Sequence, residues 1–194
     1  KKAVAYLQAE YVKLGIPSAK NDGDYFQKVP LEISKLPTGK VTVGEKEYTL
    51  GDHILSFSAT TGTFDSVVYA GYGIEDDAYS DYTNIDVKDQ YVFVKAGEPI
   101  SNDSTYTISG TKEKSLWSNI SEALGKKMQL AKDKGARGVF YFDSANYPRF
   151  KSRYDYMKTA DSGNMSVVSG EKNDYVSFFV DQDFATAITY HILT

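Results

Sequence analysis

The sequence predicts a mixed α/β fold: a small mixed sheet, one main crossover helix, and a helix–strand appendage at the N-terminus. Short β-branched and aromatic runs, such as Val67–Ala70 and Tyr91–Val94, suit buried strands. The segment 119–134 carries apolar residues at helical spacing and is followed at once by the strand-like run Gly138–Phe142. A helix between strands in this tight order is typical of a crossover between parallel strands. We expect core strands at residues 66–72, 91–95, 138–142 and 175–180.

Length and composition bound the class of protein. A chain of 194 residues can bury a sizeable core in one domain with an appendage. Its net charge of −4 argues against a general nucleic-acid binder, because phosphate binding requires a basic field. The absence of cysteine excludes disulfides and thiolate zinc sites. No apolar run approaches ~20 residues, so we expect no membrane span.

The first forty residues predict a helix followed by a strand. Residues 3–14 place apolar side chains on one helical stripe, and Gly15 with Pro17 ends the helix. The run 27–33 alternates in the manner of a half-buried strand. We expect both elements to pack on another domain, which would leave part of the helix stripe poorly covered here. The stripe consists of Val4, Leu7, Tyr11 and Leu14, and the strand alternation of Val29, Leu31 and Ile33.

The middle of the chain predicts short strands joined by loops. Residues 38–50 indicate a hairpin with Gly44 in the turn, and residues 53–63 indicate extended chain and loop. The strand at 67–70 ends at Gly71 and Gly73, and an acidic loop follows it. Residues 97–114 are rich in small polar residues and predict a surface excursion.

The second half contains the clearest helix. Residues 119–134 carry one apolar stripe, with Asn119 or Ser118 as the N-cap and Gly135 at the end. We expect residues 146–173 to form a long irregular segment, with a strand at 165–168. A last short helix at 184–193 follows, capped by Asp181 or Asp183. The stripe of the main helix consists of Ile120, Ala123, Leu124, Met128 and Ala131.

Two blocks of residues carry a resemblance to a known family. The first is Val67 to Pro99, with GYGI, an acidic loop containing SDY, then IDVKDQYVFV and GEP. The second has Trp117-Ser118, Lys127, Ala131 and GARGVFYF at 135–142. In order and spacing they resemble the protease-associated (PA) domain inserted in zinc aminopeptidases of metallopeptidase family 28. The resemblance covers about residues 65–184, and the first forty residues more loosely.

The resemblance implies a PA-type swivelling β/β/α domain at residues 41–194, with residues 1–40 similar to the start of a peptidase domain. It implies an exported parent enzyme, periplasmic or extracellular, whose signal segment is not in this chain. Two zinc ions are expected in the parent's catalytic domain and no cofactor in this chain. The expected partners are that catalytic domain and a peptide or protein substrate.

In such enzymes the inserted domain lies beside the active-site cleft, where it shapes substrate access or binds peptide or protein. We therefore expect residues 72–82 and 147–156 to face substrate or the catalytic domain. The candidate surface residues are Tyr72, Asp76, Asp77, Tyr79, Asp81, Tyr82, Tyr147, Arg149, Phe150, Arg153 and Tyr154.

The sequence lacks the catalytic residues of such a peptidase. A two-zinc aminopeptidase needs histidines, aspartates and paired glutamates as ligands and general base. This chain has only His53 and His191, with no HExxH, no Glu-Glu pair and no His-x-Asp, and we interpret both as surface or structural histidines. It also lacks a G-x-S-x-G nucleophile elbow. We therefore expect no catalysis by this chain alone.

Several alternatives stay open. The acidic loop, with Glu75, Asp76, Asp77 and Asp81, is either a solvated loop or a calcium site. Gly71-Tyr72-Gly73 lacks the third glycine of a dinucleotide turn. The segment YPRFKSRYDYM either contacts a partner or covers the core with its aromatics. The alternative function is a stand-alone module that binds peptide or protein on an exposed sheet edge or aromatic patch. A parent reading frame that ends near Thr194 would favour that alternative.

Overall fold

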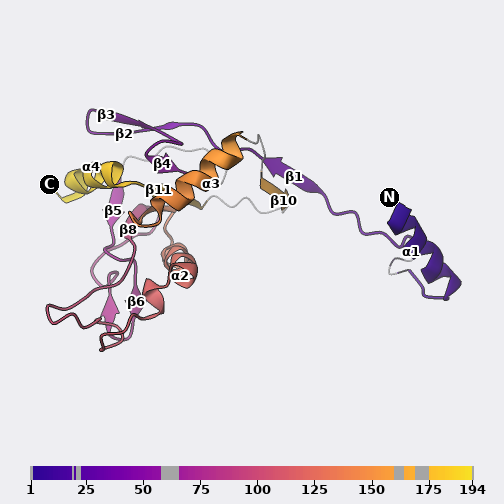
Figure 1. Cartoon of the computed structure of the whole chain (residues 1–194), viewed down its shortest axis with the longest axis horizontal. Coiled ribbons are helices and arrows are strands. Elements are labelled where there is room, and N and C mark those ends of the chain that lie inside the picture. The colour runs from indigo at the N-terminus through magenta and orange to yellow at the C-terminus, as the bar shows by residue number, and fades with distance from the viewer. Residues whose placement is uncertain are drawn as a thin grey trace. The chain divides into compact units, whose positions relative to one another are not determined.

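The computed structural model describes residues 2–18, 20, 23–57, 66–159, 164–168 and 175–193, and Figure 1 labels their helices and strands. The chain divides into two compact units. One comprises Lys1–Glu32 with Ser166–Val168, and the other Ile33–Met165 with Ser169–Thr194. The boundary expected at residue 40 therefore falls inside the second unit.

Helix α1 (Lys2–Lys13) forms as expected and leaves its apolar side chains uncovered. Gly15 has a positive φ of 67°, and the Ile16 amide donates to the Tyr11 carbonyl, which closes the helix end. No side chain of α1 is buried, and Leu14 is 68% exposed. Within the described residues of its own unit, the stripe is therefore not covered.

Strands β1 (Leu31–Ser34) and β10 (Asn164–Val167) form a two-stranded sheet. The strand predicted at 165–168 is confirmed, but the one predicted at 27–33 begins only at Leu31. Val29, Leu31 and Ile33 are all exposed, so the half-burial expected against another domain stays a prediction. Alternation predicts which side chains share a face, but it does not supply a layer to cover that face.

The second unit is built on a five-stranded mixed sheet with the order β4-β11-β9-β8-β5. Strands β5 (Val67–Tyr69), β8 (Tyr91–Lys95), β9 (Gly138–Phe142) and β11 (Val176–Val180) are parallel and confirm the four predicted core strands. Strand β4 (Ile54–Leu55) runs antiparallel to β11. The sequence predicted extended chain and loop at residues 53–63; both side chains of β4 are fully buried, and residues 58–63 lie outside the described residues.

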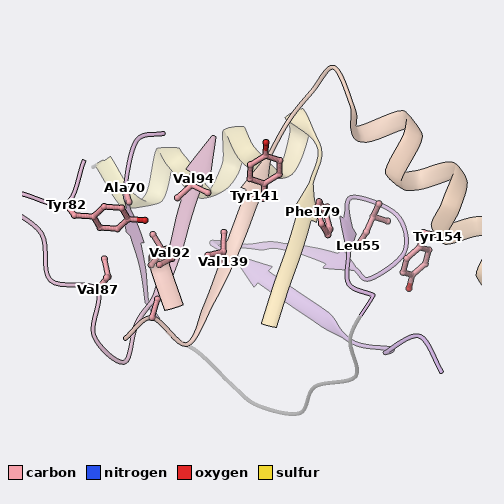
Figure 2. Close-up of a cluster of buried hydrophobic side chains, with 12 residues drawn as sticks. Leu55, Ala70, Tyr82, Val87, Val92, Val94, Val139, Tyr141, Tyr154 and Phe179 are labelled. Atoms are coloured by element: carbon pink, nitrogen blue, oxygen red, sulfur yellow. The ribbon is translucent and has the colours of Figure 1, made fainter. Parts of the chain in front are cut away.

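Side chains alternate between the two faces of this sheet. Figure 2 shows Val92, Val94, Val139 and Tyr141 projecting from the face turned away from α4. Helices α2 and α3 cover that face. The opposite face carries Phe93, Phe140 and Phe178 under α4 and a β-hairpin. The sheet is thus the middle of three layers, and both of its faces are buried.

Helix α2 (Ile120–Asp133) follows a short 3-10 helix, η1 (Leu116–Ser118). Its N-cap is Asn119, whose side chain accepts a hydrogen bond from the Ser121 amide; this decides between the two predicted caps. Every residue of the predicted stripe is buried or half-buried. The helix connects β8 to β9 and confirms the predicted parallel crossover.

Helix α3 (Tyr147–Thr159) is a correction, because we expected irregular chain there. The Asp143 carboxylate accepts hydrogen bonds from the Asn146 amide and side chain, which fixes the chain just before the helix. The side chains that face the core recur at spacings of three, four and three, a helical stripe that the intervening Arg and Lys obscured. They are Tyr147, Phe150, Tyr154 and Met157. Since α3 lies between β9 and β11, the sheet has two crossover helices rather than one.

Helix α4 (Gln182–Leu193) and the hairpin of β2 (Lys40–Val43) and β3 (Lys46–Thr49) cover the other face. Asp181 is the N-cap of α4, because its carboxylate accepts from the Phe184 amide. The hairpin and its Gly44 turn, with φ of +59°, are confirmed. Tyr48 packs edge-on against Phe184, with ring centroids 5.0 Å apart, and joins hairpin to helix.

The connections carry small elements of their own. The acidic loop contains a minimal hairpin of β6 (Glu75–Asp76) and β7 (Tyr79–Ser80), which the sequence did not predict. The excursion at 97–114 is largely exposed beyond its first residues, as expected, and single bridges at Tyr106 hold it. Among the described residues, no helix is long and apolar enough to span a membrane.

Two glycines provide a matched test of the packing. A Cβ at Gly138 would lie 2.5 Å from the Val176 carbonyl oxygen, in the close approach of β9 to β11. We therefore expect Gly138→Ala to lower the free energy of unfolding by ~1–3 kcal/mol. At Gly125, on the exposed face of α2, a Cβ meets nothing within 4 Å, so Gly125→Ala should stabilise by ~0.5–1 kcal/mol. Urea unfolding of both variants measures this; equal effects at the two sites would contradict the packing.

Candidate functional site

The candidate site lies where the parallel strands end. Because β5, β8 and β9 are parallel and in register, their carboxyl ends lie along one edge of the sheet. The segments that follow them, residues 70–82, 95–98 and 143–146, are called the carboxyl-end loops here. Ligands of parallel α/β sheets commonly bind outside this edge. The motifs GYGI and SDY and the first residues of GEP lie on these loops, and Trp117, Ser118 and Lys127 contact them.

Asp81 holds the first of these loops. Its Oδ2 accepts hydrogen bonds from the amides of Tyr72, at 3.1 Å, and Ile74, at 3.0 Å. Its Oδ1 accepts from the Tyr79 hydroxyl at 2.6 Å. Gly71 has a positive φ of 50°, and a Cβ there would collide with the Asp81 carboxylate. The glycines of GYGI and the aspartate of SDY therefore form one structural unit.

The acidic residues of this loop bind different protein groups. Glu75 pairs with Lys134 at 2.8 Å, and Asp76 accepts from the Trp117 indole nitrogen at 3.1 Å. Asp77 is exposed. The described residues contain no group of three or more His, Asp or Glu side chains that could hold a metal ion. Three of the four carboxylates, those of Glu75, Asp76 and Asp81, thus bind groups of the protein itself.

Two buried charged residues tie the loop after β8 to the region of α2. Glu98 is 2% exposed and accepts from the amide and hydroxyl of Ser115 and from the hydroxyl of Ser118, at 2.7–2.8 Å. In the other direction, Lys127 of α2 donates to the carbonyls of Gly97, at 2.6 Å, and Lys95, at 3.1 Å. We call this pair of contacts the Glu98–Lys127 clamp. It closes the base of the excursion between β8 and α2.

The environment of Lys127 disfavours its charge. The side chain has no exposed area, and this burial lowers the pKa of Lys127 from 10.5 to about 8. The nearby carboxylates of Asp81, Glu98 and Asp143 act in the opposite direction. The Tyr72 ring lies 4.2 Å from the Lys95 ammonium and 5.8 Å from that of Lys127. Tyr72, a predicted surface residue, is thus held over two lysine side chains.

The other predicted site residues do not form one surface. Residues 72–82 follow β5 at one margin of the sheet, whereas α3 packs on β4 and β11 at the other margin. Tyr82 and Tyr154 are buried in the core, and a surface role for them is not supported. Tyr147 and Phe150 are half-buried, the first donating to the Asp52 carbonyl and the second packing on Phe179. Asp77, Arg149 and Arg153 are exposed, and their role as partner contacts stays a prediction.

The two histidines lie away from these loops and contact α4 or belong to it. His53 Nδ1 lies 2.7 Å from Asp181 Oδ2, and Asp181 also caps α4. His191 belongs to the last turn of α4, and its ring packs against the Gly44 turn. Sequence reasoning missed Asp143, Ser115 and Ser118 as site-building residues. The Asp143-to-Asn146 spacing before an aromatic stripe was the available signal for the first of these.

No protein-family model matches this chain, and no curated protein matches it.

The pKa of Lys127 gives a pH test with a defined sign. Below pH 8 the folded chain holds the buried ammonium at a cost. Between pH 8 and 10.5 the folded chain loses this proton while the unfolded chain keeps it, so stability rises with pH. The shift corresponds to about 3 kcal/mol at most. We expect the wild-type free energy of unfolding to rise from pH 7 to 9.5 relative to Lys127→Met; parallel curves would contradict this.

The Tyr82 hydroxyl offers a second test. Among the described residues it is the one buried side-chain polar atom without a hydrogen-bond partner. We expect Tyr82→Phe to be neutral or to stabilise by up to ~1 kcal/mol, because an unpaired buried hydroxyl is costly. The matched variant is Tyr175→Phe, which removes a 2.7 Å hydrogen bond to the Met128 carbonyl and should cost about 1 kcal/mol. Thermal and urea unfolding of both measure the difference, and a larger loss for Tyr82→Phe would be the contrary result.

Proposed function

We propose that this chain is the non-catalytic PA domain of an exported zinc-dependent aminopeptidase resembling metallopeptidase family 28, where it shapes substrate access or binds peptide. The observation that carries the proposal is the connection between the two motif blocks. Asp81 clamps the GYGI turn, Glu98 of GEP holds the residues beside Trp117, and Lys127 returns to the loop after β8. Residues that were grouped by resemblance alone are joined by hydrogen bonds in the fold.

The uncovered apolar side chains of the N-terminal segment support attachment to a larger protein. Val4 and Leu7 of α1 and Leu14 just after it are each about half exposed or more, although they form a regular stripe. The apolar side chains of β1 and β10 are also exposed, namely Leu31, Ile33, Met165 and Val167. Stripes of this kind are normally buried against a neighbouring domain. A peptidase domain continuous with this segment would supply that layer and carry the zinc ligands.

The proposal predicts where activity and metal reside. Chain 1–194 should hydrolyse no aminoacyl p-nitroanilide and bind no stoichiometric zinc. A product of the parent gene that continues past Thr194 should do both. Metal content by atomic absorption and initial rates on the same preparations measure this. Zinc and turnover in the short chain, or a longer product without either, would sink the proposal.

The surface residues can be tested in that longer protein. We expect Asp77→Ala combined with Arg149→Ala and Arg153→Ala to raise KM for peptides of four or more residues, with kcat and KM for dipeptide-sized substrates unchanged. The matched control is Lys112→Ala, another exposed charge, on the excursion between β8 and α2. Unchanged KM and length preference in the triple variant would remove these residues from the proposed surface.

A further inference from the structure

A cleft of about 450 Å³ lies on the α4 side of the sheet, away from the carboxyl-end loops. Residues 41–44 of the hairpin form one wall and α4 forms another, and the start of β5 closes it. This volume is within the range of sites that hold small ligands or single side chains. The lining side chains include Val41, Val43, Val67, Ile188, Ile192 and His191.

The cleft adjoins an open edge of the sheet. Strand β5 ends the strand order, and no other strand of the described residues pairs with its outer side. The Ala70 amide donates to the Phe93 carbonyl of β8, so Val68 and Ala70 direct their backbone groups toward β8. Because these directions alternate along a strand, the backbone groups of Val67 and Tyr69 point to the open side. An edge of this kind can accept an additional extended chain.

The charge of the lining limits the class of ligand. Among the described residues, no Asp, Glu, Lys or Arg lines the cleft, and the polar groups there are hydroxyls, an imidazole and backbone. An ionic ligand such as a phosphate or a dicarboxylate would lose its hydration without a compensating charge. Branched walls formed by valine and isoleucine fit an aliphatic side chain instead. An uncharged cleft beside unpaired backbone groups is complementary to an extended peptide with an aliphatic residue.

We propose that β5 and this cleft form a peptide-binding site, in which an extended peptide adds to the edge of β5 and inserts one aliphatic side chain between the hairpin and α4. Backbone hydrogen bonds to Val67 and Tyr69 supply affinity, and the cleft supplies selectivity for the inserted residue. The inference deepens the proposed peptide-handling role and rests on it for its biological meaning. The binding itself is a property of chain 1–194.

The test is an amide NMR titration of chain 1–194 with two blocked pentapeptides of threonine, one with leucine and one with aspartate at the centre. The leucine peptide should shift the amides of Val43, Val67, Tyr69 and His191 and bind at least about tenfold more tightly than the aspartate peptide. Absence of shifts at these amides, or equal affinity for the two peptides, would overturn the proposal.

Variants separate the edge from the cleft. Val67→Pro removes an outward backbone donor at the first position of an edge strand, where proline is tolerated, and also changes one lining side chain, so it should weaken binding of both peptides about tenfold. Ser66→Trp places a large ring at the cleft entrance from an exposed position and should abolish leucine selectivity. Thr49→Trp, exposed on β3 and outside the cleft, is the control and should bind as wild type.

Two results would count against the peptide as occupant. Concentration-dependent line broadening at β5 without peptide would assign the edge to a second copy of this chain. Ser66→Trp with a native spectrum and unchanged selectivity would overturn the cleft as the site of the inserted side chain. The NMR titration does not measure peptidase activity. A negative result would therefore overturn the peptide site without bearing on the proposed parent enzyme, which is tested by zinc content and activity.

Discussion

The arrangement of the carboxyl-end loops depends on the reciprocal contacts of the Glu98–Lys127 clamp. Glu98 belongs to the loop after β8 and binds the residues that precede α2, whereas Lys127 belongs to α2 and binds the loop after β8. The two contacts together hold the start and the end of the excursion between β8 and α2 close to each other. Between them lies an excursion of more than fifteen residues whose ends would otherwise be held only by the chain. Because both side chains are buried, neither can exchange its partner for water without opening the loop.

This clamp carries a cost, since burial of a charged side chain is unfavourable unless its bonds are complete. Glu98 accepts three hydrogen bonds and is well compensated, whereas Lys127 has two carbonyl acceptors and a lowered pKa. Because Lys127 is less well compensated than Glu98, we infer that it positions the loop after β8 more than it stabilises the fold. It fixes the turn that brings Lys95 beneath Tyr72, and Asp81 fixes Tyr72 from the other side.

Sequence patterns predicted the interior of the sheet well because buried strands and their crossover helix are specified locally. The runs that became β5, β8, β9 and β11 are apolar enough to identify, and Asn119 marks the start of α2. The patterns did not predict elements whose secondary structure depends on residues far away in the sequence. Ile54 and Leu55 are too few to predict a strand, and only pairing with β11 makes them one. In α3 the helical stripe was present, but alternating basic residues suggested a surface segment. For the candidate site, the sequence could not show that Tyr82 and Tyr154 are core residues rather than surface contacts to a partner, because tyrosine is common both in cores and at interfaces.

The motif residues of the carboxyl-end loops are explained by the fold and do not identify a ligand. Gly71 of GYGI leaves room for the Asp81 carboxylate, and Gly73 leaves room for the Val94 side chain, which a Cβ would approach to 2.7 Å. Glu98 accepts hydrogen bonds from both serines that precede α2. These constraints specify a fold, and any protein with this loop arrangement would obey them whatever it binds. Specificity must therefore lie in groups that the fold leaves unused, namely the exposed charges of α3, the uncovered stripe of α1, and the open edge of β5. Within the described part of the chain, the third of these combines backbone groups that no strand pairs with a cleft without Asp, Glu, Lys or Arg, and on these two features the proposed peptide site depends.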